Sequence, residues 1–238
     1  KMADLKTKYM GMEIKNPLVV GACSLSLKVD TIKELEEAGA GALVIKSLFE
    51  EQIQLENAEF EEQLTQHDAQ YAEALNLFPK MDHSGPKEHL HWVTKAKKEV
   101  SMPLVASLNA VTEPVWVDYA KQLAETGVDG LELNFYSFPQ GPLMGSDIEG
   151  RELEIFAKVR EAVKIPIAVK LHPYYTNMFH VASAFDKAGA DAIVMFNRLY
   201  QPDIDITNLS EKNSLVLSDS SDSRVPLRWT ALLHGKVE

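Results

Sequence analysis

Three stretches of the chain share one pattern of hydrophobic and polar positions. Each passes from a charged helix end through a glycine into a short run of branched apolar residues. The stretches are residues 36–46 (EEAGAGALVIK), 124–134 (AETGVDGLELN) and 186–197 (DKAGADAIVMFN). Their glycines, Gly39, Gly127 and Gly189, stand where a helix C-cap needs a left-handed residue. Apolar runs without alternation are typical of strands buried on both faces.

Two further stretches enter an apolar run through a proline, at Pro103 in residues 98–109 and at Pro166 in residues 160–172. Proline fits the first residue of a strand, where no ladder donor is lost. The run at residues 16–22 (NPLVVGA) indicates a sixth strand by the same reasoning. Helical patterns separate these strands or follow them, at residues 30–38, 87–100, 113–126, 147–163, 178–188 and 225–236.

Alternation of strand and helix at this spacing predicts a parallel sheet with right-handed crossovers. The strand-to-helix turns lack GxGxxG, which argues against a dinucleotide-binding sheet. The regular repeat favours a TIM (β/α)₈ barrel, with about six βα units present in these 238 residues and roughly two fewer than closure requires. We therefore expect one domain over residues 1–238 that is incomplete at its C-terminal side. Residues 49–85 form a long acidic insertion, expected to be a lid or a dimer contact.

Every predicted strand ends in a group that can form hydrogen bonds or carries a positive charge. In strand order these groups are Ser24, Lys46, Asn109, Asn134, Lys170 and Asn197. In a barrel all of them meet at one rim, where the chemistry of this fold is found. Amide and ammonium groups are costly to bury unpaired, so together they predict a ligand. An extended heterocycle with several carbonyl and N–H groups would satisfy them.

The motifs that contain these strand ends resemble the dihydroorotate dehydrogenase family, especially its divergent bacterial branch. In chain order the motifs are NPLVVGACSLS (16–26), VIKSLFEE (44–51), ASLN (106–109), ELN (132–134), AVKLHP (168–173) and FNRLYQPDID (196–205). The resemblance implies an FMN-dependent oxidoreductase. It also implies six residues that bind the flavin: Ala22, Ser24, Lys46, Asn109, Asn134 and Lys170. Among these, Lys170 would lie at the flavin N1–C2=O edge, where a positive charge stabilises the reduced cofactor.

For the substrate, the resemblance implies contacts from Asn76, Asn134 and Asn197, with Lys46 touching both substrate and flavin. The family carries a Cys or Ser general base in the loop after the fourth strand. Counting from Asn134 places Ser137 at that position, although its neighbours depart from the family pattern and Tyr136 is a rival. The family also holds the FMN phosphate in glycine-rich turns after strands seven and eight, which this sequence does not contain.

Charge and cysteine content restrict the remaining classes of function. The formal net charge of −11 argues against nucleic-acid or anionic-membrane partners. The single cysteine, Cys23, excludes an internal disulfide and favours a reducing, cytoplasmic setting. No histidine spacing matches a known metal motif, so we expect no metal site. The expected partner is a small-molecule substrate, and whether the chain forms a homodimer is left open.

The sequence therefore predicts hydride transfer between a dihydropyrimidine-type substrate and flavin N5. Oxidation of dihydroorotate to orotate, a step of pyrimidine biosynthesis, is the favoured reaction. Two alternatives stay open. One is a flavin-free TIM-barrel isomerase or lyase acting on a phosphorylated substrate, which would be expected to carry carboxylates at several strand ends. The other is a truncated, non-catalytic barrel.

Overall fold

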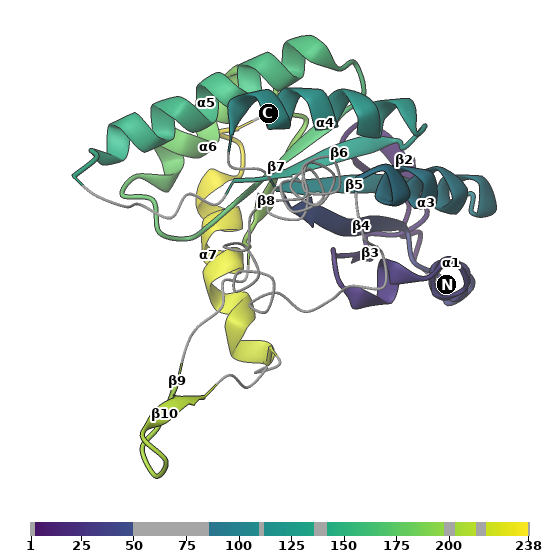
Figure 1. The fold of residues 1–238 in the computed structure, drawn as a ribbon. Coiled ribbons are helices and arrows are strands. Elements are labelled where there is room, and N and C mark those ends of the chain that lie inside the picture. The colour runs from purple at the N-terminus through teal and green to yellow at the C-terminus, as the bar shows by residue number, and fades with distance from the viewer. Residues whose placement is uncertain are drawn as a thin grey trace, which may run out of the picture.

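A curled, all-parallel sheet of six strands forms the centre of the molecule (Figure 1). The computed structural model describes residues 3–49, 86–109, 112–135, 142–197, 203–212 and 218–237. The strands follow chain order in the sheet: β3 Val19–Val20, β4 Ala42–Phe49, β5 Leu104–Asn109, β6 Gly130–Asn134, β7 Ile167–Leu171 and β8 Ala192–Met195. Because each strand pairs with its sequence neighbour and helices connect them, the fold is of the TIM-barrel type, as predicted.

Helices cover one face of this sheet. They are α1 Val29–Glu37, α3 Pro86–Glu99, α4 Glu113–Glu125, α5 Gly145–Ala162, α6 Met178–Lys187 and α7 Arg224–Leu233. Each agrees with its predicted range to within three residues. The glycines after α1, α4 and α6 have φ of +102°, +86° and +93°, which confirms the predicted left-handed caps. No helix in the described ranges is both long and apolar enough to cross a bilayer.

Alternate residues of β3, β4, β5, β7 and β8 enter two different apolar clusters, whereas β6 contributes only to the larger one. The larger cluster lies between sheet and helices and contains Trp116, Phe156 and Phe185, all almost completely buried. The smaller cluster lies on the other, concave face and is built on Met10, Val44, Val105 and Ala168. The four central strands are therefore buried on both faces, as their unbroken apolar runs predicted, whereas β3 and β8 at the edges of the sheet are half-buried.

Two hairpins were not predicted. The first joins β1 Thr7–Tyr9 to β2 Met12–Ile14 through Met10 and Gly11, both with positive φ. It places Met10 against the start of β6, where a Cβ on Gly130 would lie 2.9 Å from Met10 Cε. The second joins β9 Asp203–Asp205 to β10 Ser210–Lys212 and extends away from the sheet (Figure 1). Strands of three residues are too short to show a readable alternation.

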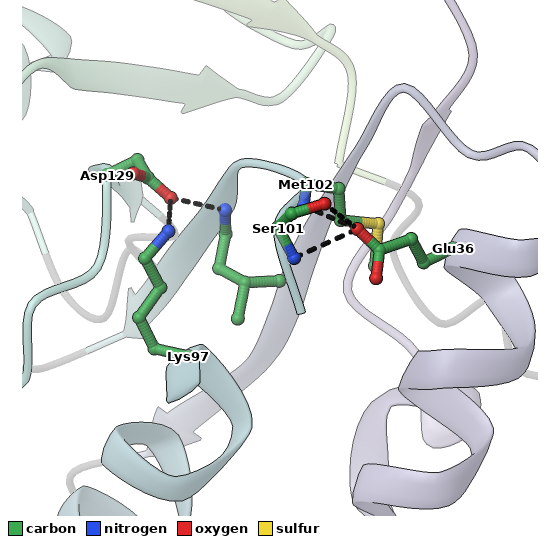
Figure 2. Close-up of polar contacts among 6 residues, drawn as sticks. Glu36, Lys97, Ser101, Met102 and Asp129 are labelled. Atoms are coloured by element: carbon green, nitrogen blue, oxygen red, sulfur yellow. Dashed lines mark hydrogen bonds and ion pairs between the residues drawn. The ribbon is translucent and has the colours of Figure 1, made fainter. Parts of the chain in front are cut away.

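Two aspartates clamp neighbouring elements at the N-terminal end of the sheet, and Figure 2 shows the first of them. Asp129 Oδ2 accepts hydrogen bonds from Lys97 Nζ at 2.6 Å and from the Leu104 N–H at 2.7 Å. Asp191 Oδ2 accepts equivalent bonds from Arg160 Nη1 at 2.9 Å and from the Ile167 N–H at 2.8 Å. Each aspartate lies two residues after a helix-capping glycine. The same pair of hydrogen bonds therefore recurs in both copies of the sequence repeat.

The first repeat has Gly41 in place of this aspartate, because another group occupies the space. A Cβ on Gly41 would lie 2.2 Å from the carbonyl oxygen of Asn16. Asn16 provides the missing bonds instead, donating from Nδ2 to the Gly39 carbonyl at 2.8 Å and accepting the Leu18 N–H at 3.0 Å. These bonds set the entry to β3, which is much shorter than the run at 16–22 suggested.

Glu36, at the end of α1, forms a third clamp at the same end of the sheet (Figure 2). Its Oε1 accepts bonds from the Ser101 hydroxyl at 2.6 Å and from the N–H groups of Ser101 and Met102 at 2.9 and 2.7 Å. Hydrogen bonding, above all from the Ser101 hydroxyl, holds the pKa of Glu36 below its ordinary value. The carboxylate thus ties α1 to the segment that leads into β5.

We predict that Asp129→Ala lowers the free energy of unfolding by about 1–3 kcal/mol, because it leaves the Leu104 N–H and the Lys97 ammonium without their acceptor. Denaturant unfolding measures the change. The matched control is Asp118→Ala, since exposed Asp118 accepts only an exposed bond from Gln122. That control should change stability by no more than about 0.5 kcal/mol. Equal losses in the two variants would contradict the clamp.

We also predict opposite effects from alanine at two glycines. Gly41→Ala forces its Cβ against the Asn16 backbone and should cost about 1–3 kcal/mol. Gly150→Ala, within α5, meets no atom within 4 Å and should stabilise the protein by roughly 0.5–1 kcal/mol through helix propensity. Thermal unfolding of both variants tests this, and a stable Gly41→Ala protein would contradict the close approach.

Candidate active site at the carboxyl ends of the strands

The concave face of the sheet changes from apolar to polar along the strands. Val105 and Ala168 belong to its apolar cluster near the strand starts. Two residues further along, alternation brings Ser107 and Lys170 to the same face. Glu132 lies opposite Ser107 and Ala168 in the register, so it faces the interior as well. The interior therefore has an apolar floor with polar side chains above it.

These polar side chains form one connected layer across four strands. Ser47 Oγ and Ser107 Oγ are 2.7 Å apart, and Ser107 Oγ donates to Glu132 Oε1 at 3.4 Å. Because the Ser107 proton points to Glu132, Ser47 must be the donor to Ser107. Lys170 Nζ lies 3.4 Å from the same Glu132 oxygen and forms an ion pair with it. The layer joins β4, β5, β6 and β7, and Glu132 is the group on which it converges.

Glu132 also acts on the N-terminal hairpin. Burial, and then the negative charge of Glu132, raise the pKa of Tyr9 far above its ordinary value. The Tyr9 phenol therefore stays protonated at physiological pH. Tyr9 packs against the same apolar cluster as Met10. The β1–β2 hairpin, which closes the interior near the strand starts, therefore lies close enough to Glu132 to be affected by its charge.

Asn134 and Lys170 are direct register partners on β6 and β7, next to the carboxyl edge of the sheet. Asn134 is only 7% exposed, and its Oδ1 has no hydrogen-bond partner among the described residues. A buried amide oxygen without a donor is costly, so this position is suited to a ligand N–H. Asn109, the last residue of β5, is half-buried at the same edge.

Lys46 lies in a β-bulge of β4. The register between β4 and β5 shifts between Ile45 and Leu48, so Lys46 and Ser47 together oppose Ser107. The Lys46 N–H donates to the hydroxyl of buried Ser26 at 2.9 Å. Its carbonyl lies 3.4 Å from His89 Nε2 on α3. Side chains from outside the strand thus fix the Lys46 backbone, and the bulge turns Ser47 into the interior.

The other predicted residues lie at the same edge with fewer contacts. Ala22 is half-buried and packs against the interior cluster. Ser24 is exposed and begins the 3-10 turn η1 Ser24–Leu27. The Asn197 N–H donates to the Leu171 carbonyl at 2.8 Å, so Asn197 stays beside the end of β7. Phe49, the first residue of the predicted insertion, ends β4, whereas residues 50–85, Asn76 among them, and Ser137 lie outside the described residues.

The motifs VIKSLFEE, ASLN and ELN contain the three residues that hold this layer together, Ser47, Ser107 and Glu132, but sequence reasoning gave them no role in the site. Glu132 could have been found by counting back two residues from Asn134, because side chains two apart share a strand face. The same count from Asn109 finds Ser107. Ser47 could not have been found this way, since strict alternation from Ile45 would send it toward the helices.

A second buried group lies just beyond β7. The rings of His172 and Tyr175 stack with centroids 3.9 Å apart and planes inclined by 13°. The Tyr175 hydroxyl donates to Glu152 Oε2, on α5, at 2.7 Å. Burial lowers the pKa of His172, and its Nδ1 accepts the Tyr174 N–H at 3.1 Å, so the ring is neutral at physiological pH. This group fixes the loop after Lys170.

In the described part of the chain, no three His, Cys, Asp or Glu side chains lie close enough together to bind a metal ion. The polar groups at the rim are amides, hydroxyls and ammonium groups, which suit an organic ligand with both donors and acceptors.

Comparison with known proteins gives a consistent family. The chain is 30% identical over 213 residues to a dihydroorotate dehydrogenase B (NAD(+)) catalytic subunit from Thermoplasma volcanium, covering 88% of this chain and 67% of that protein. It is 29% identical to the corresponding subunit from Methanocaldococcus jannaschii, covering 85% and 65% of the two chains. It is 28% identical to a dihydroorotate dehydrogenase A (fumarate) from Limosilactobacillus reuteri, again covering 85% and 65%. The chain thus spans about two thirds of the length of these curated relatives.

No family model matches the chain. Among solved structures, a dihydrodipicolinate synthase from Agrobacterium tumefaciens has a TM-score of 0.48 at 16% identity, covering 74% of this chain and 52% of that one. A phosphoenolpyruvate phosphomutase from Streptomyces platensis has a TM-score of 0.48 at 15% identity, covering 76% and 55%. Likeness this distant has no bearing on function. The sequence matches are informative, because they extend over most of the chain and the matched proteins share one family name. The chain belongs to the dihydroorotate dehydrogenase family.

Proposed function

We propose that this protein is an FMN-dependent oxidoreductase that oxidises dihydroorotate, or a closely related dihydropyrimidine, to the unsaturated ring. One observation carries the proposal: Asn134, whose buried Oδ1 has no hydrogen-bond partner in the part of the chain that the structure describes, lies in register with the ammonium-bearing Lys170 at the carboxyl edge of the sheet. An acceptor beside a donor, both on the concave face, calls for a ligand that offers an N–H next to a carbonyl.

The isoalloxazine ring of FMN has this pattern of an N–H flanked by carbonyl groups. Asn134 would accept from the ring N–H, and Lys170 would donate to the N1–C2=O edge. Asn109 ends β5, Ser24 follows β3, and Lys46 lies in the bulge of β4, three residues before the end of that strand, which extends past the predicted end at Lys46. These three would contact the remaining edges, with Ala22 against the ring face. Bound FMN would supply a two-electron acceptor at N5, which no amino-acid side chain provides.

The names of the relatives support the substrate. Proteins that are 27–30% identical over 82–88% of this chain are named dihydroorotate dehydrogenases, although they differ in the electron acceptor that their names print. Dihydroorotate presents ring amides and a carboxylate. Asn134 and Asn197 would orient the ring amides, and Asn76 would add a contact from the insertion.

Oxidation of dihydroorotate removes a hydride from one ring carbon and a proton from its neighbour. The hydride leaves toward the flavin, so the chain must accept the proton. We retain Ser137 as the proposed base, with Tyr136 as its rival, because both follow Asn134 by a few residues. A serine hydroxyl is a weak base and would need an activating neighbour. Lys46 would bind substrate and cofactor together.

The first test is direct. Titration of purified protein with FMN should change the flavin absorbance spectrum to saturation, because Asn134 and Lys170 offer matching groups to the ring. Free FMN is kept in excess, because the family's glycine-rich phosphate turns are not in this sequence. Anaerobic addition of dihydroorotate should then bleach that absorbance. Dihydrouracil, which lacks the carboxylate, serves as the control and should bleach it far more slowly. Protein that takes up no FMN at any concentration tested would contradict the proposal.

We further predict that Lys170→Ala slows flavin reduction by about 100-fold, the scale found when one preorganised charge-stabilising donor is removed. Stopped-flow measurement of the bleaching rate gives the effect. Lys164→Ala is the matched control, since Lys164 is an exposed lysine just before β7 and should leave the rate unchanged. Equal rates in the two variants would argue against an electrostatic role for Lys170.

A further inference from the structure

We infer that Glu132 is a positioning residue that holds the Lys170 ammonium inside the barrel and balances its charge beneath the cofactor. The inference rests on the proposed function, because it assigns Glu132 an effect on bound flavin that acts through Lys170. Neither the strand-end pattern nor the family resemblance singled out this carboxylate.

The burial of Glu132 requires an explanation. Its residue is only 2% exposed, and it faces an interior whose neighbouring positions are small or apolar, such as Gly130 and Ala168. A buried carboxylate costs several kcal/mol unless it is paired and hydrogen-bonded. The carboxylate is therefore better explained by what it does to its partners than by packing.

Every contact of Glu132 that the structure shows is directed to its negative charge. Lys170 Nζ and the Ser107 hydroxyl both approach Oε1, at 3.4 Å each, and Ser47 orients Ser107 from behind. Tyr9, on the hairpin below, lies within the field of the same charge. Two hydroxyls arranged in series toward one oxygen stabilise a charged acceptor more than a neutral one.

Lys170 depends on this partner. Its side chain is 17% exposed, against 3% for that of Glu132, so the pair lies where the interior opens toward the rim. Attraction between two charges is stronger here than at the surface, because little water screens them. In the absence of cofactor, a protein without Glu132 has lost the group that keeps the Lys170 ammonium inside, so the flexible lysine would turn toward solvent. Bound flavin would hold the ammonium at its N1–C2=O edge instead.

The charge of Glu132 has a definite consequence for the cofactor. The reduced flavin carries more negative charge than the oxidised flavin, so a lone ammonium at its edge favours the reduced form. Glu132 offsets part of that effect, because the pair as a whole is neutral. It therefore keeps the reduction potential lower than Lys170 alone would set it.

Glu132→Gln is the decisive variant, because it removes the charge and keeps the shape and an acceptor oxygen. Equilibration of the FMN-loaded protein against a redox dye should show the oxidised-to-reduced ratio shifted about tenfold toward the reduced form, or ~30 mV for a two-electron couple. In FMN-free protein, mass spectrometry after reductive methylation should show several-fold more modification at Lys170. An unchanged potential in this variant overturns the inference.

Asp129→Asn is the matched control. Asp129 pairs with Lys97 Nζ at 2.6 Å, as Glu132 pairs with Lys170, but it lies at the N-terminal end of the sheet, away from the rim. It should lose stability on the same scale as Glu132→Gln and leave both the potential and the Lys170 modification unchanged. If the reduction potential shifted equally in both variants, the shift would reflect a general loss of stability and not the charge of Glu132. That result would also overturn the inference.

A second pair of variants keeps the test available if Glu132→Gln does not fold. The double variant Glu132→Gln/Lys170→Met removes both charges, so neither is left buried without its partner. It should therefore fold at least as well as either single variant. Compared with Lys170→Met alone, it should bind flavin whose ratio is again shifted toward the reduced form. Identical ratios would show that the Glu132 charge does not reach the cofactor.

Failure of the proposed function is distinguishable from failure of this inference. If wild-type protein takes up no FMN, the proposed function fails and the modification of Lys170 in flavin-free protein decides the positioning role by itself. Equal modification of Lys170 in wild type and Glu132→Gln would then overturn that role. If wild-type protein binds FMN and only the potential fails to shift, the inference fails while the proposed function stands.

Discussion

A strand that is buried on both faces sends alternate side chains into two environments, and every polar group on either side must find a partner there. On the helical side of this sheet, the strands contribute apolar side chains that pack against the helices and need no hydrogen-bond partner. On the concave side the space is closed from below by Met10 and its hairpin. The polar residues above that floor can satisfy one another only across strands, which is why Ser47, Ser107, Glu132 and Lys170 form one layer.

The two ends of the sheet use charge differently. At the N-terminal end, Asp129, Asp191 and Glu36 each accept backbone N–H bonds at the entrance to a strand, so their charges serve to hold elements together. At the carboxyl end, Asn134 keeps a buried acceptor without a donor in the described residues. This division matches the general rule for barrels, in which the first end carries stability and the second carries chemistry.

Local sequence was sufficient for the helices, for the six parallel strands and for their order. Apolar periodicity and helix-capping glycines located the six α-helices of the described ranges to within three residues, because helix ends depend on nearby residues. The hairpins β1–β2 and β9–β10 were missed, since three residues carry too little pattern. The strand ends gave the rim groups Asn134 and Lys170 by residue type alone. Their neighbour Glu132 was overlooked, because a charged residue within an apolar run has no local signal that explains it.

Sequence by itself thus determined which groups would stand at the rim, through the period of two in strands and the fixed direction of parallel ones. Only the tertiary structure decided how those groups pair. Lys170 and Glu132 are 38 residues apart in the chain, and register between neighbouring strands alone brings their charges to 3.4 Å. The bulge at Lys46 and Ser47 reverses the local alternation, so Ser47 faces inward against the pattern. Long-range pairing of this kind depends on strand register, which no local stretch of sequence encodes.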